Sequence, residues 1–216
     1  MHRLDLEIWF IRHAESEANV KRIYANTGHS FPLTTNGLEQ ARAMSGPFSA
    51  LEVCAVYTSP LLRAIQTAEE ICRLKKIGIR IAPELSEYNM GIYEGTSSLP
   101  DTPGAISDAE SKRRWFEQND FDARSPGGES LRDMKCRFLA FIARTIEIHV
   151  GTPGIILMIT HGGILNAVLP FVFENLDPAF VRARSIPHLG IVKGKPENGR
   201  LICLEYDGNS VAGFGQ

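Results

Sequence analysis

Residues 6–13 read LEIWFIRH, a largely apolar run that ends in an arginine and a histidine. Two further stretches have the same form: VCAVYTS at residues 53–59 and IILMITHGG at residues 155–163. Their apolar parts lack the alternation of a half-exposed strand, so each predicts a strand that is buried on both faces. Such strands are typical of parallel sheets, and we therefore expect a mostly parallel central sheet.

Helical patterns lie between these strands. Thr34 or Thr35 can cap a helix that runs to about residue 50, and Pro60 is well placed in the first turn of a helix that runs to about Leu74. A third helix begins near Glu129 and carries apolar residues at spacings of three and four. The alternation of strand and helix predicts an α/β fold.

Residues 96–128 are polar and rich in proline and glycine, apart from a charged helix candidate at 107–118. We interpret them as an insertion that serves as a substrate lid, with an ordinary surface insertion as the alternative. The tail has two strand-like pieces, residues 186–192 and 200–206, joined by a turn. With 216 residues the chain is short of two average domains, so residues 1–216 are expected to form a single domain.

Composition excludes several classes of protein. A hydrophobic content of 44% argues against disorder, and 23 basic against 25 acidic residues leave no basic field for a nucleic acid or an anionic membrane. The apolar stretch at 154–173 contains His161, Asn166 and Pro170 and has no basic flank, so it is interpreted as a strand and a helix rather than a membrane span.

The chain carries four cysteines, Cys54, Cys72, Cys136 and Cys203, that are far apart and form no CxxC pair. They are interpreted as reduced, packed thiols, not as a disulfide framework or a zinc site. Because the first residues also lack the pattern of a secretory signal, a cytoplasmic location is expected.

Polar residues follow the predicted strands at one edge of the sheet, where ligands collect in α/β proteins. Arg12 and His13 follow the first strand, Arg63 comes one helical turn after the second, and His161 follows the third. Histidines flanked by guanidinium groups make a poor metal site and a good phosphate site. A neutral imidazole there can attack a clamped phosphoryl group, giving a phosphohistidine without a metal or other cofactor.

These residues also belong to motifs that resemble those of the histidine phosphatase superfamily (branch 1), the group that includes the cofactor-dependent phosphoglycerate mutases. The similar blocks follow in order between about residues 8 and 165: IRHAESEAN at 11–19, LTxxGxxQA at 33–41, SPLLRAIQTA at 59–68, LSE at 85–87 with Gly91 and Glu94-Gly95, PGGES at 126–130 and THGG at 160–163. The resemblance implies a phosphoglycerate mutase-like fold, a three-layer α/β/α sandwich.

The resemblance also implies catalytic roles. His13 matches the nucleophile, Arg12 and Arg63 match phosphate-binding residues, and His161 matches the histidine that hydrogen-bonds the transferring phosphoryl group. Glu87 takes the place of the general acid, for which it would need a raised pKa. The alternative for Glu87 is a surface carboxylate without a catalytic role.

Three further residues are predicted to bind phosphate or substrate: Asn19, Ser16 as a weaker candidate, and Gly162. Gly162 and Gly163 can permit a sharp turn, aim backbone N–H groups at an anion, or do both. One position departs from the family pattern, since Ala14 stands where glycine is usual. Its methyl group is tolerable if φ is negative.

The other histidines lie outside the matched blocks. Surface or packing roles are expected for His2, His29, His149 and His188, with the reservation that His188 begins a late strand that could end near the pocket.

The expected activity is that of a metal-independent phosphomonoesterase of the histidine acid phosphatase type, acting on a small phosphorylated substrate. The alternatives are a cofactor-dependent phosphoglycerate mutase and a catalytically inactive binding or scaffold protein of the same fold. Lys112-Arg113-Arg114-Trp115 is a candidate substrate clamp, but the proline-rich stretch of the mutases does not follow it. The sequence leaves the physiological substrate and the oligomeric state open.

Overall fold

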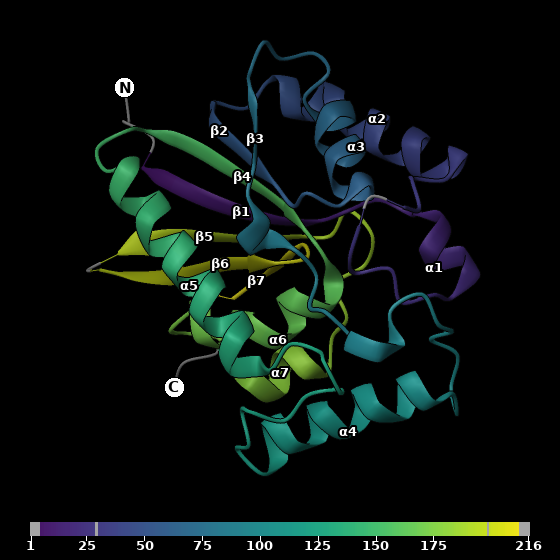
Figure 1. Cartoon of the computed structure of the whole chain (residues 1–216). Coiled ribbons are helices and arrows are strands. Elements are labelled where there is room, and N and C mark those ends of the chain that lie inside the picture. The colour runs from purple at the N-terminus through teal and green to yellow at the C-terminus, as the bar shows by residue number, and fades with distance from the viewer. Residues whose placement is uncertain (1–4, 29, 198, 212–216) are drawn as a thin grey trace.

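A seven-stranded sheet forms the centre of the molecule, with the strand order β3-β2-β4-β1-β5-β6-β7 (Figure 1). The structure is a computed structural model that describes residues 5–28, 30–197 and 199–211. The strands are β1 Leu6–Arg12, β2 Val53–Thr58, β3 Ile79–Ile81, β4 Gly154–Thr160, β5 Ile191–Glu197, β6 Arg200–Tyr206 and β7 Asn209–Ser210.

The four strands β3, β2, β4 and β1 are parallel, and β5, β6 and β7 add an antiparallel edge. The predicted mostly parallel sheet core is therefore confirmed. Neighbouring strands β1 and β4 pair in register from Leu6 opposite Gly154 to Arg12 opposite Thr160. Because both strands end at the same level, the residues that follow them emerge side by side.

The sheet is covered by helices whose ends follow local sequence signals. They are α1 Glu17–Lys21, α2 Thr35–Ser49, α3 Leu62–Ile71, α4 Pro103–Glu117, α5 Leu131–Ile148, α6 Gly162–Val172 and α7 Pro178–Arg182, with short 3₁₀ turns η1 Pro83–Leu85 and η2 Gly91–Tyr93. The Thr34 hydroxyl caps α2 by accepting a 2.9 Å hydrogen bond from the amide of Gly37, and Ser130 forms a capping box with Asp133 at the start of α5.

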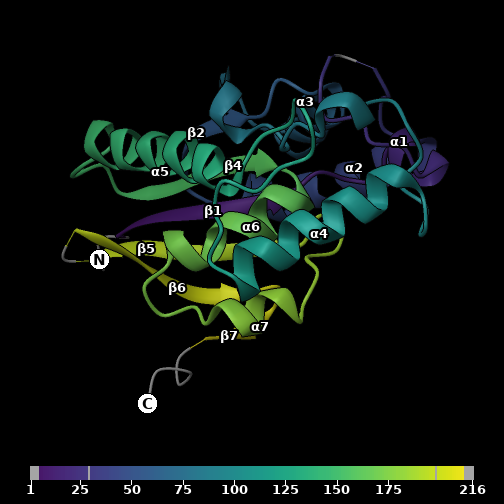
Figure 2. The same cartoon turned by 60° about the horizontal axis from the view of Figure 1, so that its bottom comes forward.

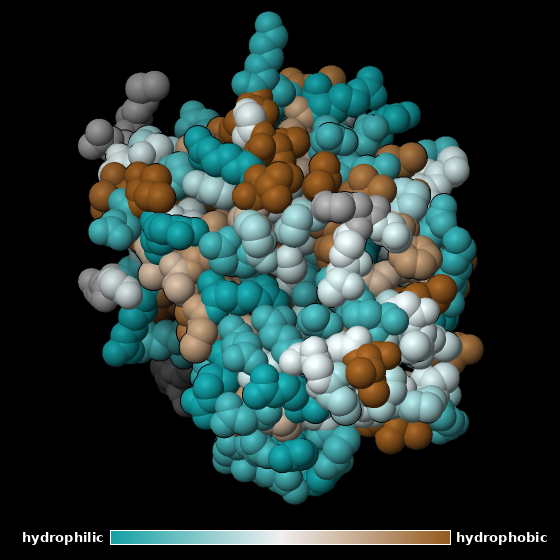
Figure 3. All heavy atoms as spheres, in the orientation of Figure 1, coloured by the Kyte–Doolittle hydropathy of each residue, from teal (hydrophilic) through white to brown (hydrophobic). Residues whose placement is uncertain are grey.

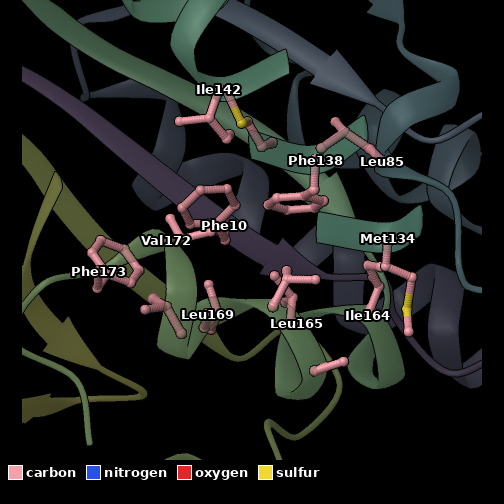
Figure 4. Close-up of a cluster of buried hydrophobic side chains, with 14 of the residues drawn as sticks. Phe10, Leu85, Met134, Phe138, Ile142, Ile164, Leu165, Leu169, Val172 and Phe173 are labelled. Carbon is pink, nitrogen blue, oxygen red and sulfur yellow. The ribbon is translucent and has the colours of Figure 1, made fainter. Parts of the chain in front are cut away.

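Alternate side chains of the central strands face two different helical layers. In β1, Ile8 and Phe10 belong to the core on the α5 and α6 side, whereas Trp9 and Ile11 belong to the core under α2 and α3. Figure 4 shows the first of these cores, in which the ring of Phe10 lies 5.8 Å from that of Phe138. The predicted three-layer sandwich is confirmed.

The insertion at 96–128 contains α4, which lies at the outside of the molecule near α6 and α7 (Figure 2). Trp115 is only 1% exposed and packs α4 against the body, where its ring lies 6.0 Å from that of Tyr88; its indole nitrogen donates to the Ala123 carbonyl within the insertion at 2.6 Å. The guanidinium of Arg182 in α7 lies 5.1 Å from the ring of Phe116. The outer surface of α4 is largely hydrophilic (Figure 3). Two expectations stay predictions: that residues 1–216 form a single domain, and that this insertion acts as a substrate lid.

The basic residues of the candidate clamp are occupied within the insertion. Lys112 pairs with Asp108 at 2.7 Å, Arg113 with Glu110 at 2.8 Å, and Arg114 with Asp120.

Some expectations for the tail and the cysteines are wrong. No strand begins at residue 186, since β5 starts at Ile191. The preceding segment is a loop in which Leu189 has a positive φ of 60° and bonds through its amide to the Arg12 carbonyl at 3.0 Å. All four cysteines are free, but Cys136 is exposed rather than packed because it lies on the outer face of α5.

The stretch at 154–173 folds as β4 and α6, as expected. No helix in the described part of the chain has the length and apolar character needed to cross a membrane.

Candidate active site

The structure brings the two motif histidines together. His13 follows β1 and His161 follows β4, and because these strands are paired in register their imidazole rings lie 5.0 Å apart. Arg63 reaches the same point from the first turn of α3, after β2. All three side chains are buried, with at most 4% of each residue exposed. The predicted convergence at the carboxyl ends of three strands is therefore present.

The hydrogen bonds of His13 define a neutral imidazole with one unprotonated ring nitrogen. Its Nδ1 lies 2.6 Å from the Ala14 carbonyl, an acceptor only, so Nδ1 carries the proton. Its Nε2 accepts a 3.1 Å hydrogen bond from Nε of Arg63. Burial, and next the charge of Arg63, lowers the pKa of His13 well below its usual value. Nε2 is therefore unprotonated at neutral pH and is available as a nucleophile.

Two arginines surround this nitrogen and keep donors for an anion. Arg63 also donates from Nη1 to the Ala25 carbonyl at 2.6 Å, and burial lowers its pKa to about 10, so it remains charged. Arg12 donates from Nη1 to the Ile186 carbonyl at 2.7 Å. The Nε of Arg12 is buried without a hydrogen-bond partner among the described residues. An unpaired buried donor is costly unless a ligand accepts from it.

His161 is held from one side only. Its Nε2 lies 2.7 Å from the Ser59 hydroxyl, which already accepts from the Leu61 amide at 3.2 Å and can donate its own proton to the ring. The other nitrogen, Nδ1, is buried and has no partner in the part of the chain that the structure describes. Burial lowers the pKa of His161 well below its usual value, so the ring is neutral.

A cavity of about 240 Å³ lies beside these groups. Six of the eight predicted site residues line it: Arg12, His13, Asn19, Arg63, Glu87 and Gly162. The other two, His161 and Ser16, do not line it. His161 contacts the ring of His13, and the Ser16 hydroxyl lies 2.8 Å from Oδ1 of Asn19. A role for Ser16 in phosphate binding stays a prediction, and its observed contact orients Asn19 with the amide nitrogen left available.

Glu87 lies where α6 begins. Its Oε2 accepts a 2.8 Å hydrogen bond from the Gly163 amide and its Oε1 accepts a 3.1 Å bond from the Tyr88 amide. The N-terminus of α6, where an anion is favoured, is therefore occupied by the carboxylate of Glu87. Burial raises the pKa of Glu87, although these amides and the charge of Arg63 act in the opposite direction. The raised pKa is the property expected of a general acid.

The two glycines of the turn leave room for two different side chains. A Cβ on Gly162 would lie 3.0 Å from Nε of Arg12, and a Cβ on Gly163 would lie 2.8 Å from Oε2 of Glu87. Ala14 is accommodated without strain, since it is not among the described non-glycine residues with positive φ and its side chain packs in a small cluster with Leu33 and Ala41.

Three polar residues near the cavity were not predicted as site residues. Asn166 lines the cavity with a buried Oδ1 that has no described partner, and Asn26 lines it from the loop after α1. A lone amide one helical turn after Gly162, in an otherwise apolar helix, was the available signal for Asn166. His188 lies outside the cavity lining with its ring 6.0 Å from that of His13, and burial lowers its pKa to about 4.

The remaining histidines are accounted for where the structure describes them. His149 has the expected packing role, since its Nε2 lies 3.1 Å from the Tyr57 hydroxyl in the core. His2 and His29 lie outside the described residues. Within the described ranges no group of three or more His, Cys, Asp or Glu side chains is placed to hold a metal ion.

Comparisons with known proteins agree with this architecture. The chain is 31% identical over 167 residues to the adenosylcobalamin/alpha-ribazole phosphatase of Escherichia coli, covering 76% of this chain and 77% of that protein. It is 30% identical over 181 residues to a protein of Enterobacter named probable phosphoglycerate mutase, covering 83% and 79%.

Solved structures give the same result for the fold. The alpha-ribazole phosphatase of Shigella flexneri superimposes with a TM-score of 0.74 at 25% identity, covering 93% of this chain and 96% of that one. The Bacillus stearothermophilus protein YhfR gives a TM-score of 0.78 at 22% identity, covering 94% and 97%. The model of the histidine phosphatase superfamily (branch 1) matches residues 8–207, and the chain therefore belongs to this superfamily.

Proposed function

We propose that the protein is a phosphomonoesterase that hydrolyses a small phosphate ester through a phosphohistidine at Nε2 of His13. The observation that carries the proposal is the lone pair of that nitrogen, which faces a guanidinium donor 3.1 Å away beside a cavity lined by two arginines. When a phosphoryl group enters, one of its oxygens replaces Nε2 of His13 as the acceptor of the Arg63 hydrogen bond. Arg63 therefore orients His13 before the substrate binds and holds the phosphoryl group afterwards.

The reaction has two halves. In the first, a bond forms between Nε2 of His13 and phosphorus while the ester P–O bond breaks, and the carboxyl of Glu87 gives its proton to the leaving oxygen. In the second, the Glu87 carboxylate takes a proton from water, the water oxygen bonds to phosphorus, and the N–P bond returns its electrons to His13. Arg12, Arg63 and His161 stabilise the phosphoryl oxygens in both halves.

The relative from Escherichia coli that is named as a phosphatase supports hydrolysis as the reaction. The relative from Enterobacter that is named as a probable phosphoglycerate mutase supports the mutase alternative. The clamp expected of a mutase is not supported, because the basic residues Lys112, Arg113 and Arg114 are paired within the insertion and line neither this cavity nor the larger one next to it. A cytoplasmic location and a small phosphorylated substrate remain part of the proposal.

The test is hydrolysis of an aryl phosphate by the wild type, His13→Ala and His149→Gln. We expect turnover and an acid-labile phosphoprotein in the wild type and the His149→Gln control, and neither in His13→Ala. Turnover no higher in the wild type than in His13→Ala would favour the scaffold alternative. With phosphoglycerate and a bisphosphoglycerate primer, rapid isomerisation without phosphate release would instead favour the mutase.

A further inference from the structure

A second and larger cavity, of about 590 Å³, adjoins the phosphate-binding cavity. Two residues, Asn26 and Glu87, line both. In the proposed reaction Glu87 protonates the oxygen that leaves phosphorus, so that oxygen lies next to Glu87 when the phosphoryl group occupies the smaller cavity. The organic group attached to the oxygen then extends into the larger one, which we call the outer cavity.

The outer cavity differs from the inner one in its charges. Its described lining includes the carboxyl groups of Glu87, Glu129 and Asp133, and Arg137 as its one described cation. Hydrogen bonds from Ser130 lower the pKa of Asp133, so this carboxylate stays charged at neutral pH. Its ion-pair partner, Arg124 at 3.2 Å, is half exposed and is not part of the lining.

Arg137 is already occupied by protein acceptors. Its Nε and Nη2 donate to the two carboxylate oxygens of Glu129 at 2.5 and 2.9 Å, and its Nη1 donates to the Glu84 carbonyl at 2.5 Å. Both partners of this pair are largely buried, with 20% and 18% of their side chains exposed. The fork that would otherwise bind a substrate carboxylate or phosphate is thus neutralised by Glu129.

We propose that the outer cavity selects phosphate monoesters whose leaving alcohol carries no negative charge, such as a neutral polyol or an amino alcohol, and discriminates against a second anionic group. This inference rests on the proposed function. A substrate carboxylate in the outer cavity would lose water and face Glu129 and Asp133 without an unpaired described cation to receive it. A hydroxyl or ammonium group there finds carboxylate acceptors instead.

The test uses two matched pairs of substrates that differ by one carboxylate. Glycerol 3-phosphate is compared with 3-phosphoglycerate, and O-phosphoethanolamine with O-phosphoserine, by kcat/KM at constant ionic strength. We expect kcat/KM to be about tenfold or more higher for the member without the carboxylate in each pair. The reason is that the substrate carboxylate would lie close to the carboxylates of Glu129 and Asp133 in a partly desolvated cavity, where repulsion between like charges is weakly screened. Equal efficiency, or preference for the carboxylated member, overturns the inference.

A substitution makes the prediction specific to the ion pair. Glu129→Gln removes the charge that neutralises Arg137, and we expect it to narrow the preference in both pairs by about tenfold, since a desolvated bidentate carboxylate site is created. The matched control is Glu70→Gln, which removes the carboxylate from a bidentate pair with Arg42 at 3.1 and 3.0 Å, away from both cavities. This control should keep the wild-type ratio.

Asp133→Asn provides a second variant should Glu129→Gln not fold, because an asparagine oxygen can still accept from Ser130. It should also narrow the preference. Unchanged ratios in both folded variants, or an equal change in Glu70→Gln, would show that the outer cavity does not set the selectivity. If the wild type hydrolyses neither these esters nor an aryl phosphate, the proposed function fails and the inference falls with it; if it hydrolyses the aryl phosphate, only the selectivity is at stake.

Discussion

Neighbouring glycines at the start of α6 offer a test that separates two catalytic functions. Gly162→Ala and Gly163→Ala add the same methyl group one residue apart, yet the added atoms meet different partners. At Gly163 the Cβ would lie 2.7 Å from the Tyr88 ring and 2.8 Å from Oε2 of Glu87. At Gly162 it would lie 3.0 Å from Nε and 3.2 Å from Cδ of Arg12.

The size of the effect follows from these distances. Ordinary contacts begin at 3.4 Å, so in Gly163→Ala the Glu87 carboxylate has to move by about 0.6 Å and its bond to the Gly163 amide is distorted. Misplacing a catalytic group by about 1 Å can cost about 100-fold, and a general acid contributes about 100-fold or more, so a loss of about 10- to 100-fold is expected for alkyl phosphates. Nitrophenyl phosphate, whose leaving group needs little protonation, should lose less than about threefold.

Gly162→Ala should behave differently, because in the proposed mechanism Arg12 binds the phosphoryl group whatever the leaving group is. We expect it to lower kcat/KM for alkyl and aryl phosphates by similar factors. The assay is steady-state kinetics on both substrates, and thermal melting verifies that each variant is folded. The substitution should not weaken the helix itself, because alanine is favoured over glycine in a helix by up to about 1 kcal/mol. Similar losses on both substrates in Gly163→Ala would refute the assignment of Glu87 as the general acid.

Three further predictions concern the pH dependence of the reaction, the methyl group of Ala14 and the insertion. The pH profile of kcat/KM should be bell-shaped, because activity falls when pH drops through the lowered pKa of His13 and when it rises through the raised pKa of Glu87; in Glu87→Gln the alkaline decline should disappear. Ala14→Gly should lower stability to chemical denaturation by about 1–2 kcal/mol, from a lost buried methyl group and added chain entropy, with turnover unchanged within about twofold. Trp115→Ala should cost about 3–5 kcal/mol in the same unfolding experiment, and a loss below about 1 kcal/mol would contradict its anchoring role.

Much of the fold could be predicted because its signals are local. The apolar runs became β1, β2 and β4, Thr34 caps α2, and α5 begins at Leu131, close to the predicted start near Glu129. The convergence of the motif residues followed from the rule that parallel strands end at one edge of a sheet. The short elements β3, β7, α1 and α7 have two to five residues each, too few for a periodic pattern.

The features that escaped prediction depend on contacts between distant segments. Trp115 is a core residue although it lies in a charged, polar stretch, because the insertion folds back on the body. The loop before β5 contacts Arg12 through backbone bonds that no side-chain pattern encodes, and it brings His188 near His13. The outer cavity was not predicted for the same reason, since Arg137 is held on its wall by the Glu84 carbonyl, 53 residues away, while Glu129 just before α5 neutralises its charge.

The THGG segment at 160–163 shows how one turn can hold residues that are distant in sequence. Thr160 donates its hydroxyl to the Leu85 carbonyl at 2.7 Å and so holds the segment that leads to Glu87. His161 supplies the second imidazole, the bare Cα of Gly162 admits Arg12, and Gly163 both admits and hydrogen-bonds Glu87. Each of the four positions therefore places a different part of the candidate site. Among the described residues the outer cavity shares only Asn26 and Glu87 with the inner one, so other side chains of its lining can change the proposed selectivity while the proposed catalytic residues stay the same.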